Sequence, residues 1–216
     1  MSKRGEQKIR SSRAGRIGGA LVAVALSGTA ADEICVSPQG FSLTPARLDD
    51  ILVAHGRWVE NKANGSQAVL CHLEAPGIDL KGLDLSAAGF RFANLEGADL
   101  SGARLQRALF KFARLDRANL HGAMLEDTNF YKARLAGADL SNTEGDGTRL
   151  RKVIAPGIDL RNAVLPGADI GEAEPTVARF DGAKLRGVKL RKANLSGAVL
   201  AAADLYEANL RKSGFD

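Results

Sequence analysis

The residues of this 216-residue sequence best suited to chemistry are basic side chains that recur every 20 residues. Two adjacent series run from residue 91 to residue 212, and nine of their 14 positions are Lys or Arg while one is acidic. A regular row of cations could bind a repeating polyanion, because each contact with an anionic group releases counterions. A solvated protein face would have a similar composition, so both interpretations stay open. The nine residues are Arg91, Lys111, Lys132, Arg151, Lys152, Arg191, Lys192, Arg211 and Lys212.

Other reactive side chains do not form a recognisable catalytic or metal site. The three histidines, His55, His72 and His121, are too scattered to form a ligand set, and the serines have no His and acid nearby in sequence. An acidic series at the same 20-residue spacing could suggest a cation ladder, but Asp at such places usually accepts a hydrogen bond from the local backbone. The series is Asp79, Asp99, Asp139 and Asp159. We therefore predict no enzyme, no metal, no cofactor and no small-molecule substrate.

The element that must position these residues repeats every five residues. From Leu80 to Phe215 the sequence has 28 consecutive centres at this step, and 25 of them are Leu, Phe or Ile. The residue two before the centre is Ala in 19 cases. A step of five fits neither the 3.6-residue period of a helix nor the period of 2 of a long strand. Short extended segments separated by turns fit it, and such a chain winds into an all-β solenoid.

The stretches "ANLEGADLSGARL" and "ANLSGAVLAAADLYEANL" resemble the A(D/N)LXX units of the pentapeptide-repeat family. The resemblance implies a right-handed quadrilateral β-helix with four five-residue sides in each coil. Residues 78–216 would then form about seven coils. Residues 20 apart would stack, so the two basic series would become two neighbouring columns along the rod.

Three centres in the second half of the repeats are not large and apolar. They are Gly145, Ala155 and Pro175. Small centres leave less apolar volume inside, and proline cannot donate a ladder hydrogen bond. Residues 143–178 are therefore predicted to be the least regular part of the rod.

The segment before the repeats, residues 32–77, is predicted to form a helical cap. In "LTPARLDDILVAHGRWVEN", apolar residues recur at helical spacing after Thr44, a candidate N-cap, and Pro45, which suits a first helical turn. A solenoid needs its exposed end covered, so this helix is expected to cap the first coil. The carboxyl-terminal end has no visible cap, and an end-to-end homodimer through the C-terminal coil is expected there.

The first 31 residues read as a secretory signal peptide: a basic stretch, the ten apolar residues 17–26, and small residues up to Ala31. An uncleaved amino-terminal anchor is the alternative. Residues 1–31 hold six of the 30 basic residues and one of the 25 acids, so the remaining chain has 24 of each and no net charge. In an exported, periplasmic or secreted protein, Cys35 and Cys71 would form a disulfide; in the cytosol they would be reduced thiols.

These features favour a non-enzymatic binding or scaffold protein of the cell envelope that presents a rigid, charge-patterned rod to a polyanionic or protein partner. Nucleic acid is not expected to be the partner in the cell, because the positive charge of the whole sequence comes from residues 1–31. The resemblance implies an alternative, a DNA-mimicking protein that acts on DNA gyrase in the cytoplasm. That role would need an acidic rod and no export signal.

Overall fold

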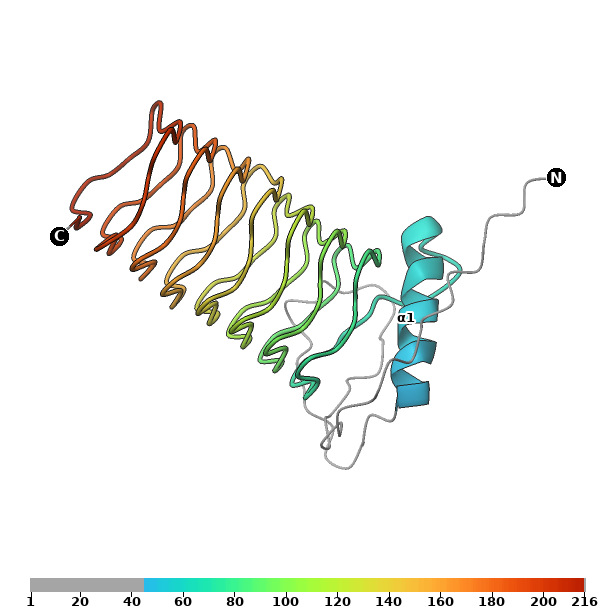
Figure 1. Ribbon diagram of the computed structural model, residues 1–216. Coiled ribbons are helices and arrows are strands. Elements are labelled where there is room, and N and C mark those ends of the chain that lie inside the picture. The colour runs from blue at the N-terminus through green and yellow to red at the C-terminus, as the bar shows by residue number, and fades with distance from the viewer. Residues whose placement is uncertain (1–44, 216) are drawn as a thin grey trace.

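The computed structural model describes residues 45–215, which form one helix followed by a stack of coils (Figure 1). Helix α1 spans Pro45–Glu60. From Val69 to Gly214 the chain makes single parallel β-bridges between residues 20 apart. The described residues contain no longer strand, because each side of a coil contributes one bridging residue before the chain turns. The predicted solenoid is therefore present.

Each five-residue unit ends in a tight turn that begins at the large apolar centre. The amide of the third residue after the centre donates to the carbonyl of the centre, as Ala88 N does to Leu85 O at 3.0 Å. The second residue after the centre has a positive φ at every corner from His72 to Lys212, and it is glycine at 12 corners and another residue at 17. Glycine adopts this conformation without steric cost, whereas a bulky side chain is unusual there.

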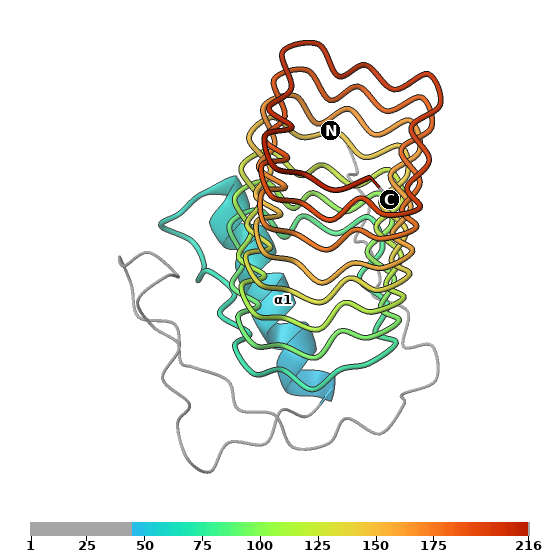
Figure 2. The same cartoon turned by 90° about the vertical axis from the view of Figure 1, so that its left-hand side faces the viewer.

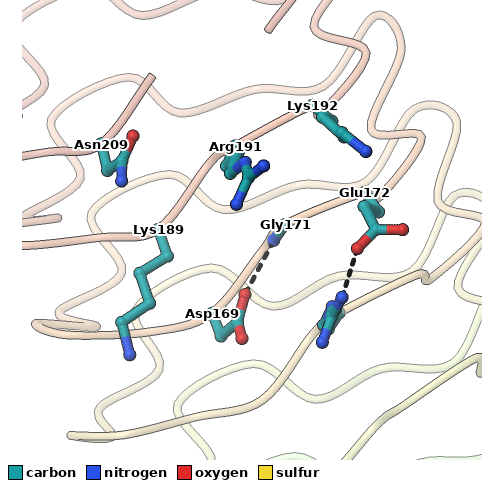
Figure 3. Close-up of a pocket in the computed structure, with 8 residues that line it drawn as sticks. Asp169, Gly171, Glu172, Lys189, Arg191, Lys192 and Asn209 are labelled. Atoms are coloured by element: carbon teal, nitrogen blue, oxygen red, sulfur yellow. Dashed lines mark hydrogen bonds and ion pairs between the residues drawn. The ribbon is translucent and has the colours of Figure 1, made fainter. Parts of the chain in front are cut away.

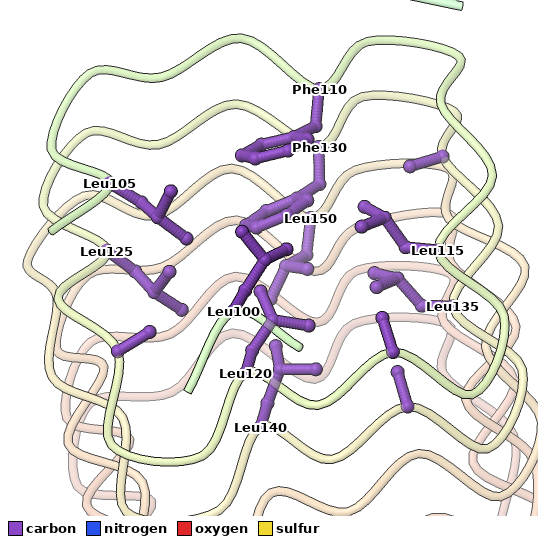
Figure 4. Close-up of a cluster of buried hydrophobic side chains, with 14 of the residues drawn as sticks. Leu100, Leu105, Phe110, Leu115, Leu120, Leu125, Phe130, Leu135, Leu140 and Leu150 are labelled. Atoms are coloured by element: carbon purple, nitrogen blue, oxygen red, sulfur yellow. The ribbon is translucent and has the colours of Figure 1, made fainter. Parts of the chain in front are cut away.

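The core consists of columns in which similar side chains stack along the rod axis. Phe90 and Phe110 stack with ring centroids 4.9 Å apart, Phe110 and Phe130 are 5.1 Å apart, and Leu150 continues the column (Figure 4). Leucine columns fill the other sides, and the alanines two residues before the centres are also buried. The interior of a coil has room for a large side chain from each of its four sides because the other inward residue on each side is small.

The bridge ladder begins earlier than the predicted boundary at residue 78. Its first member pairs Val69 with Gly89, and Leu70 is already fully buried. The expectation was wrong because the centre at position 75 is alanine, which interrupts the run of large centres in the sequence. Ala75 is nevertheless buried and belongs to the core.

Helix α1 lies against the first coils (Figures 1 and 2). Leu48 and Leu52 are buried in the common core, and His55 Nδ1 accepts a hydrogen bond from Ala68 N at 3.1 Å. After the helix the chain turns back along it, and Ser66 N donates to Ala54 O. The observed helix agrees with the predicted segment, whereas the candidate N-cap Thr44 lies outside the described residues.

The segment predicted to be irregular shows one interruption and one unexpected adaptation. The run of bridges lacks the pair Glu174 and Asn194, next to Pro175, which has no amide hydrogen to donate. Gly145 leaves no hole, because the backbone approaches the neighbouring coil: a Cβ added there would lie 2.6 Å from the Leu125 carbonyl carbon. The buried Thr148 hydroxyl donates to Leu125 O at 2.9 Å in the same place. The underpacking expected at this centre was therefore wrong.

Several sequence-based expectations concern residues outside the described part of the chain. The signal peptide in residues 1–31 and the Cys35 half of the expected disulfide both fall there. Cys71 lies within it and is buried. None of the helical structure described for residues 45–215 is long and apolar enough to cross a bilayer.

Candidate functional site

The nine predicted basic residues lie on the turns of one corner of the rod, which we call the basic edge. The edge comprises the two turn residues after each centre from Phe90 to Leu210. Its turns are joined from coil to coil by backbone hydrogen bonds, such as Phe92 N to Lys111 O at 3.1 Å and Glu172 N to Arg191 O at 2.9 Å. The structure therefore brings together side chains that are up to 121 residues apart in the sequence.

The amino-terminal part of the basic edge carries an aromatic ridge, defined as His72, Phe92, Phe112 and Tyr131. His72 stacks on Phe92 at 4.9 Å, Phe92 stacks on Phe112 at 5.0 Å, and Tyr131 meets Phe112 edge-on at 6.0 Å. Phe92 and Phe112 occupy two of the positions in the basic series that are not basic. Their position after the centre, where the chain turns, was the signal that they point outward.

Cations of the edge lie over the rings of the aromatic ridge. The Arg91 guanidinium is 5.6 Å from the centre of the Phe92 ring. Lys132 Nζ is 5.6 Å from the Phe112 ring and 5.5 Å from the Tyr131 ring. Lys111 is half-buried on the turn between them. Aromatic faces attract cations, so the contacts of Lys132 with Phe112 and Tyr131 hold this side chain beside the ridge.

In the middle of the edge two predicted cations are paired with an acid. Glu172, the acidic member of the edge, binds both Arg151 and Lys152, with Lys152 Nζ 3.4 Å from its carboxylate. The hydrogen bond from Arg151 lowers the pKa of the Glu172 carboxyl group. This triad carries a net charge of about one, so Arg151 and Lys152 offer less to an external anion than the sequence suggested.

The carboxyl-terminal part of the edge contains an open groove of about 440 Å³ (Figure 3). Gly171 forms its floor, where the other members of its series have long side chains, and Asp169 Oδ1 accepts from Gly171 N at 3.0 Å. Arg191, Lys192 and Lys189 line the groove together with Arg151, and the carboxylates Asp169 and Glu172 also line it. Sequence reasoning missed Lys189 because it precedes its centre, on the side of the rod instead of on a turn.

Most of the remaining cations of the edge are not held by acids. Among residues 45–215, no ion pair involves the side chains of Lys189, Arg191, Lys192, Arg211 or Lys212. Their like charges repel on neighbouring coils, which raises the free energy of the isolated surface. An anion in or along this groove would relieve that repulsion.

The other candidate groups are the acidic series, the histidines and the serines. All four members of the acidic series accept a hydrogen bond from the amide two residues later, as Asp99 Oδ1 does from Ser101 N at 3.0 Å, which confirms their predicted local role. The structure brings one serine next to a histidine that is distant in sequence: His121 Nδ1 lies 2.9 Å from Ser141 Oγ on the next coil. Among residues 45–215 no carboxylate is hydrogen-bonded to His121, so no acid orients it as a base.

Comparison with known proteins places the chain by its repeats. The family model "Pentapeptide repeats" matches eight copies over residues 66–102, 103–142 and 178–215, which together make up more than half of the chain. No curated protein sequence matches it.

Solved structures of pentapeptide repeat proteins are similar to the chain. HetL of the cyanobacterium Nostoc, involved in heterocyst differentiation regulation, is 27% identical with a TM-score of 0.33, over 76% of this chain and 95% of that one. A protein of the Arabidopsis thaliana thylakoid lumen is 32% identical with a TM-score of 0.23, over 58% of this chain and 70% of that one. QnrB1, a plasmid-mediated fluoroquinolone resistance protein, is 16% identical with a TM-score of 0.47, over 69% of this chain and 84% of that one. Such low TM-scores say nothing about a shared partner, but the repeats are decisive: the chain belongs to the pentapeptide-repeat family.

Proposed function

We propose that this protein is a non-enzymatic binding or scaffold protein of the cell envelope whose basic edge holds a polyanionic or acidic protein partner. The observation that carries the proposal is the set of cations around the Gly171 groove that have no acid partner among the described residues. The backbone ladder spaces these cations by one coil, about 4.8 Å, so a repeating polyanion can contact several of them at once.

The compartment follows from the sequence of the first 31 residues, which supports export to the periplasm or beyond. An oxidising compartment would also suit a Cys35 to Cys71 bridge. In such a compartment the polyanions are lipopolysaccharide cores, anionic lipid head groups and acidic proteins. Nucleic acid would bind the same cations in a test tube without being the partner in the cell.

The alternative partner, DNA gyrase, requires a rod that resembles DNA. A DNA-like surface presents rows of negative charge, whereas the turn series with the strongest charge on this rod are basic. The surface charge and the expected export signal both argue against this alternative.

An end-to-end homodimer is part of the proposal. In the last described coil, the large centres Leu200, Leu205 and Leu210 are only partly buried. A second copy placed on this end would cover the apolar centres and pair with the open backbone edge. Sedimentation should show concentration-dependent dimers, and a monomer up to high micromolar protein would contradict this.

Binding to inorganic polyphosphate at several salt concentrations tests the proposed function. The affinity should fall with salt, with a slope of roughly one logarithmic unit for each cation engaged. A variant with Arg191→Glu, Lys192→Glu, Arg211→Glu and Lys212→Glu should lose this binding and keep its melting temperature, because all four side chains are exposed.

The matched control changes four exposed cations elsewhere on the rod by the same total charge: Lys81→Glu, Arg107→Glu, Lys184→Glu and Arg186→Glu. This control should bind polyphosphate nearly as well as the unaltered chain. If both variants lose binding equally, net charge explains the effect and the basic edge does not.

A further inference from the structure

We propose that the basic edge docks lengthwise on an anionic phospholipid bilayer, with the aromatic ridge inserted among the head groups. The inference rests on the proposed function and names its partner. It depends on a feature that a charge-based proposal does not need, the two exposed phenylalanines at the amino-terminal part of the edge.

The geometry of the ridge selects the kind of partner. Phe92 is 39% exposed and Phe112 is 36% exposed. The ring planes of His72, Phe92 and Phe112 are nearly parallel, at 11° and 9° to one another, so the faces of Phe92 are covered by its neighbours. Nucleobases and sugar rings bind to aromatic faces, whereas Phe92, with a ring stacked on each face, exposes its ring edge. An exposed apolar ring edge suits insertion between lipid head groups.

The backbone position and the exposure of Phe92 and Phe112 favour a role in binding over a role in the fold. Phe92 has a φ of 59° and Phe112 a φ of 61°, which is a conformation that bulky residues rarely adopt. Glycine occupies 12 of the 29 equivalent corners, and Phe92 and Phe112 are the two phenylalanines among the other 17. Both rings also leave apolar surface in water, although the buried core of the same coils is already filled by Phe90 and Phe110. The fold therefore gains little from aromatic residues at these two corners beyond their mutual stacking.

The charges are arranged on the same line as the ridge. Lys132 lies over the Phe112 and Tyr131 rings, and Arg191, Lys192, Arg211 and Lys212 continue the edge toward the carboxyl terminus. The turns of the other three corners, between residues 76 and 207, hold five basic and seven acidic residues. Positive charge is thus concentrated on the one corner that also has the aromatic ridge.

A straight corner and a flat membrane complement each other in shape. The coils follow a nearly straight axis, so one corner can touch a plane along its whole length (Figure 1). Interfacial segments commonly combine aromatic residues at the head-group level with cations that attract anionic lipid. On this edge the aromatic ridge would anchor one end and the cations of the Gly171 groove would bind lipid phosphates at the other.

Vesicle binding by the full chain tests the inference. The protein should co-sediment with vesicles of equal parts phosphatidylglycerol and phosphatidylcholine, less well as salt rises, and should not bind vesicles of phosphatidylcholine alone. The double variant Phe92→Gln and Phe112→Gln should bind the anionic vesicles about tenfold less tightly, since it loses two inserted side chains. Its binding to polyphosphate should be unchanged.

The control removes exposed apolar side chains that lie off the edge, Val177→Ser and Val199→Ser, and should bind vesicles like the unaltered chain. In a Phe112→Trp variant, tryptophan emission should shift to shorter wavelength on anionic vesicles, whereas the unaltered chain, with Trp58 alone, should show no such shift.

The outcomes separate the two proposals. If the chain binds polyphosphate but not anionic vesicles, or if the double phenylalanine variant binds vesicles unchanged, the membrane inference fails and the proposed function stands. If the chain binds neither, both fail. Reduced vesicle binding by the phenylalanine variant, with normal melting temperature and normal polyphosphate binding, supports the inference.

Discussion

The two ends of the rod differ in how far their apolar core is covered. At the amino-terminal end, α1 covers the first coils with Leu48 and Leu52, both in the core, and with His55, which is fully buried. At the carboxyl-terminal end, Leu205 and Leu210 are partly exposed and Phe215 is 50% exposed. A stack of similar coils has no internal reason to stop, so stability at each end depends on what covers it.

This difference predicts where the rod opens first. Separation of the last coil at the open end requires the loss of contacts with one neighbouring coil, whereas the covered end must also lose α1 before its first coil can separate. Each coil contacts only its neighbours, so changes at one end should have little effect on the other. The following predictions test that contrast, from the largest expected effect to the smallest.

The largest effect is expected from the predicted disulfide between Cys35 and Cys71. Closing a loop of this length should stabilise the folded chain by about 4 kcal/mol on the chain-entropy estimate. Addition of reductant should lower the melting temperature accordingly, and mass spectrometry of the exported protein should find a new amino terminus at Ala31 or Asp32 and no alkylatable thiol. Two thiols that react without reductant would remove this contribution and the export assignment with it.

Matched truncations at the two ends measure the contrast directly. Leu48→Ala should lower the free energy of unfolding by about 3 kcal/mol, because Leu48 is 4% exposed and the change leaves a cavity under α1. Leu210→Ala removes the same atoms from a partly exposed site and should cost only about 1 kcal/mol. Chemical denaturation of the two variants provides the values. Equal losses would mean that the carboxyl-terminal coil is covered in solution, as a dimer would require.

Acid should loosen the covered end selectively. Burial lowers the pKa of His55 from 6.5 to about 4, and its Nδ1 must stay unprotonated to accept from Ala68 N. The stabilisation from neutral His55 is complete above pH 6.5 and is lost as the pH falls through 4, up to about 3 kcal/mol at full protonation. Helical circular dichroism should decrease over this range.

The control for the acid effect is His55→Asn, in which an amide oxygen can take the place of Nδ1 as acceptor. This variant should keep its helix at pH 4 to the extent that it folds at pH 7. If it loses the helix at the same pH as the unaltered chain, protonation of His55 does not cause the transition.

The sequence predicted the repeating part of this molecule better than its exceptions. A step of five with Leu95, Leu100 and Leu105 at the centres indicates the coil, because no other regular element uses that period. The same periodicity located the basic columns. The periodicity did not locate the first coil, because the small centre Ala75 interrupts the run of large ones. It also did not predict that the backbone at Gly145 lies close to the neighbouring coil.

The sequence predicted which residues lie at the candidate site, but not which contacts their side chains make. Column analysis finds which side chains share a corner, yet it does not show which of them are engaged. The pairing of Arg151 and Lys152 with Glu172, the stacking of Phe92 on Phe112, and the place of Lys189 in the groove all depend on side-chain directions. These directions follow from packing between coils, which a single sequence does not contain.

The smallest expected effect concerns the interruption at Pro175, which lies between the two ends. The neighbouring centres Leu195 and Ala155 are both buried, so the defect is a missing donor more than a hole. Pro175→Leu restores an amide that can donate to Asn194 O, as centres elsewhere donate to the coil that follows, and should stabilise the rod by about 1 kcal/mol. Hydrogen exchange should report faster opening in residues 174–178 than in coils 93–140 of the unaltered chain, and the variant should remove that difference. Exchange that is equally slow in both segments would show that one missing bridge does not divide the rod, and that the contrast between its ends is the only weakness that matters.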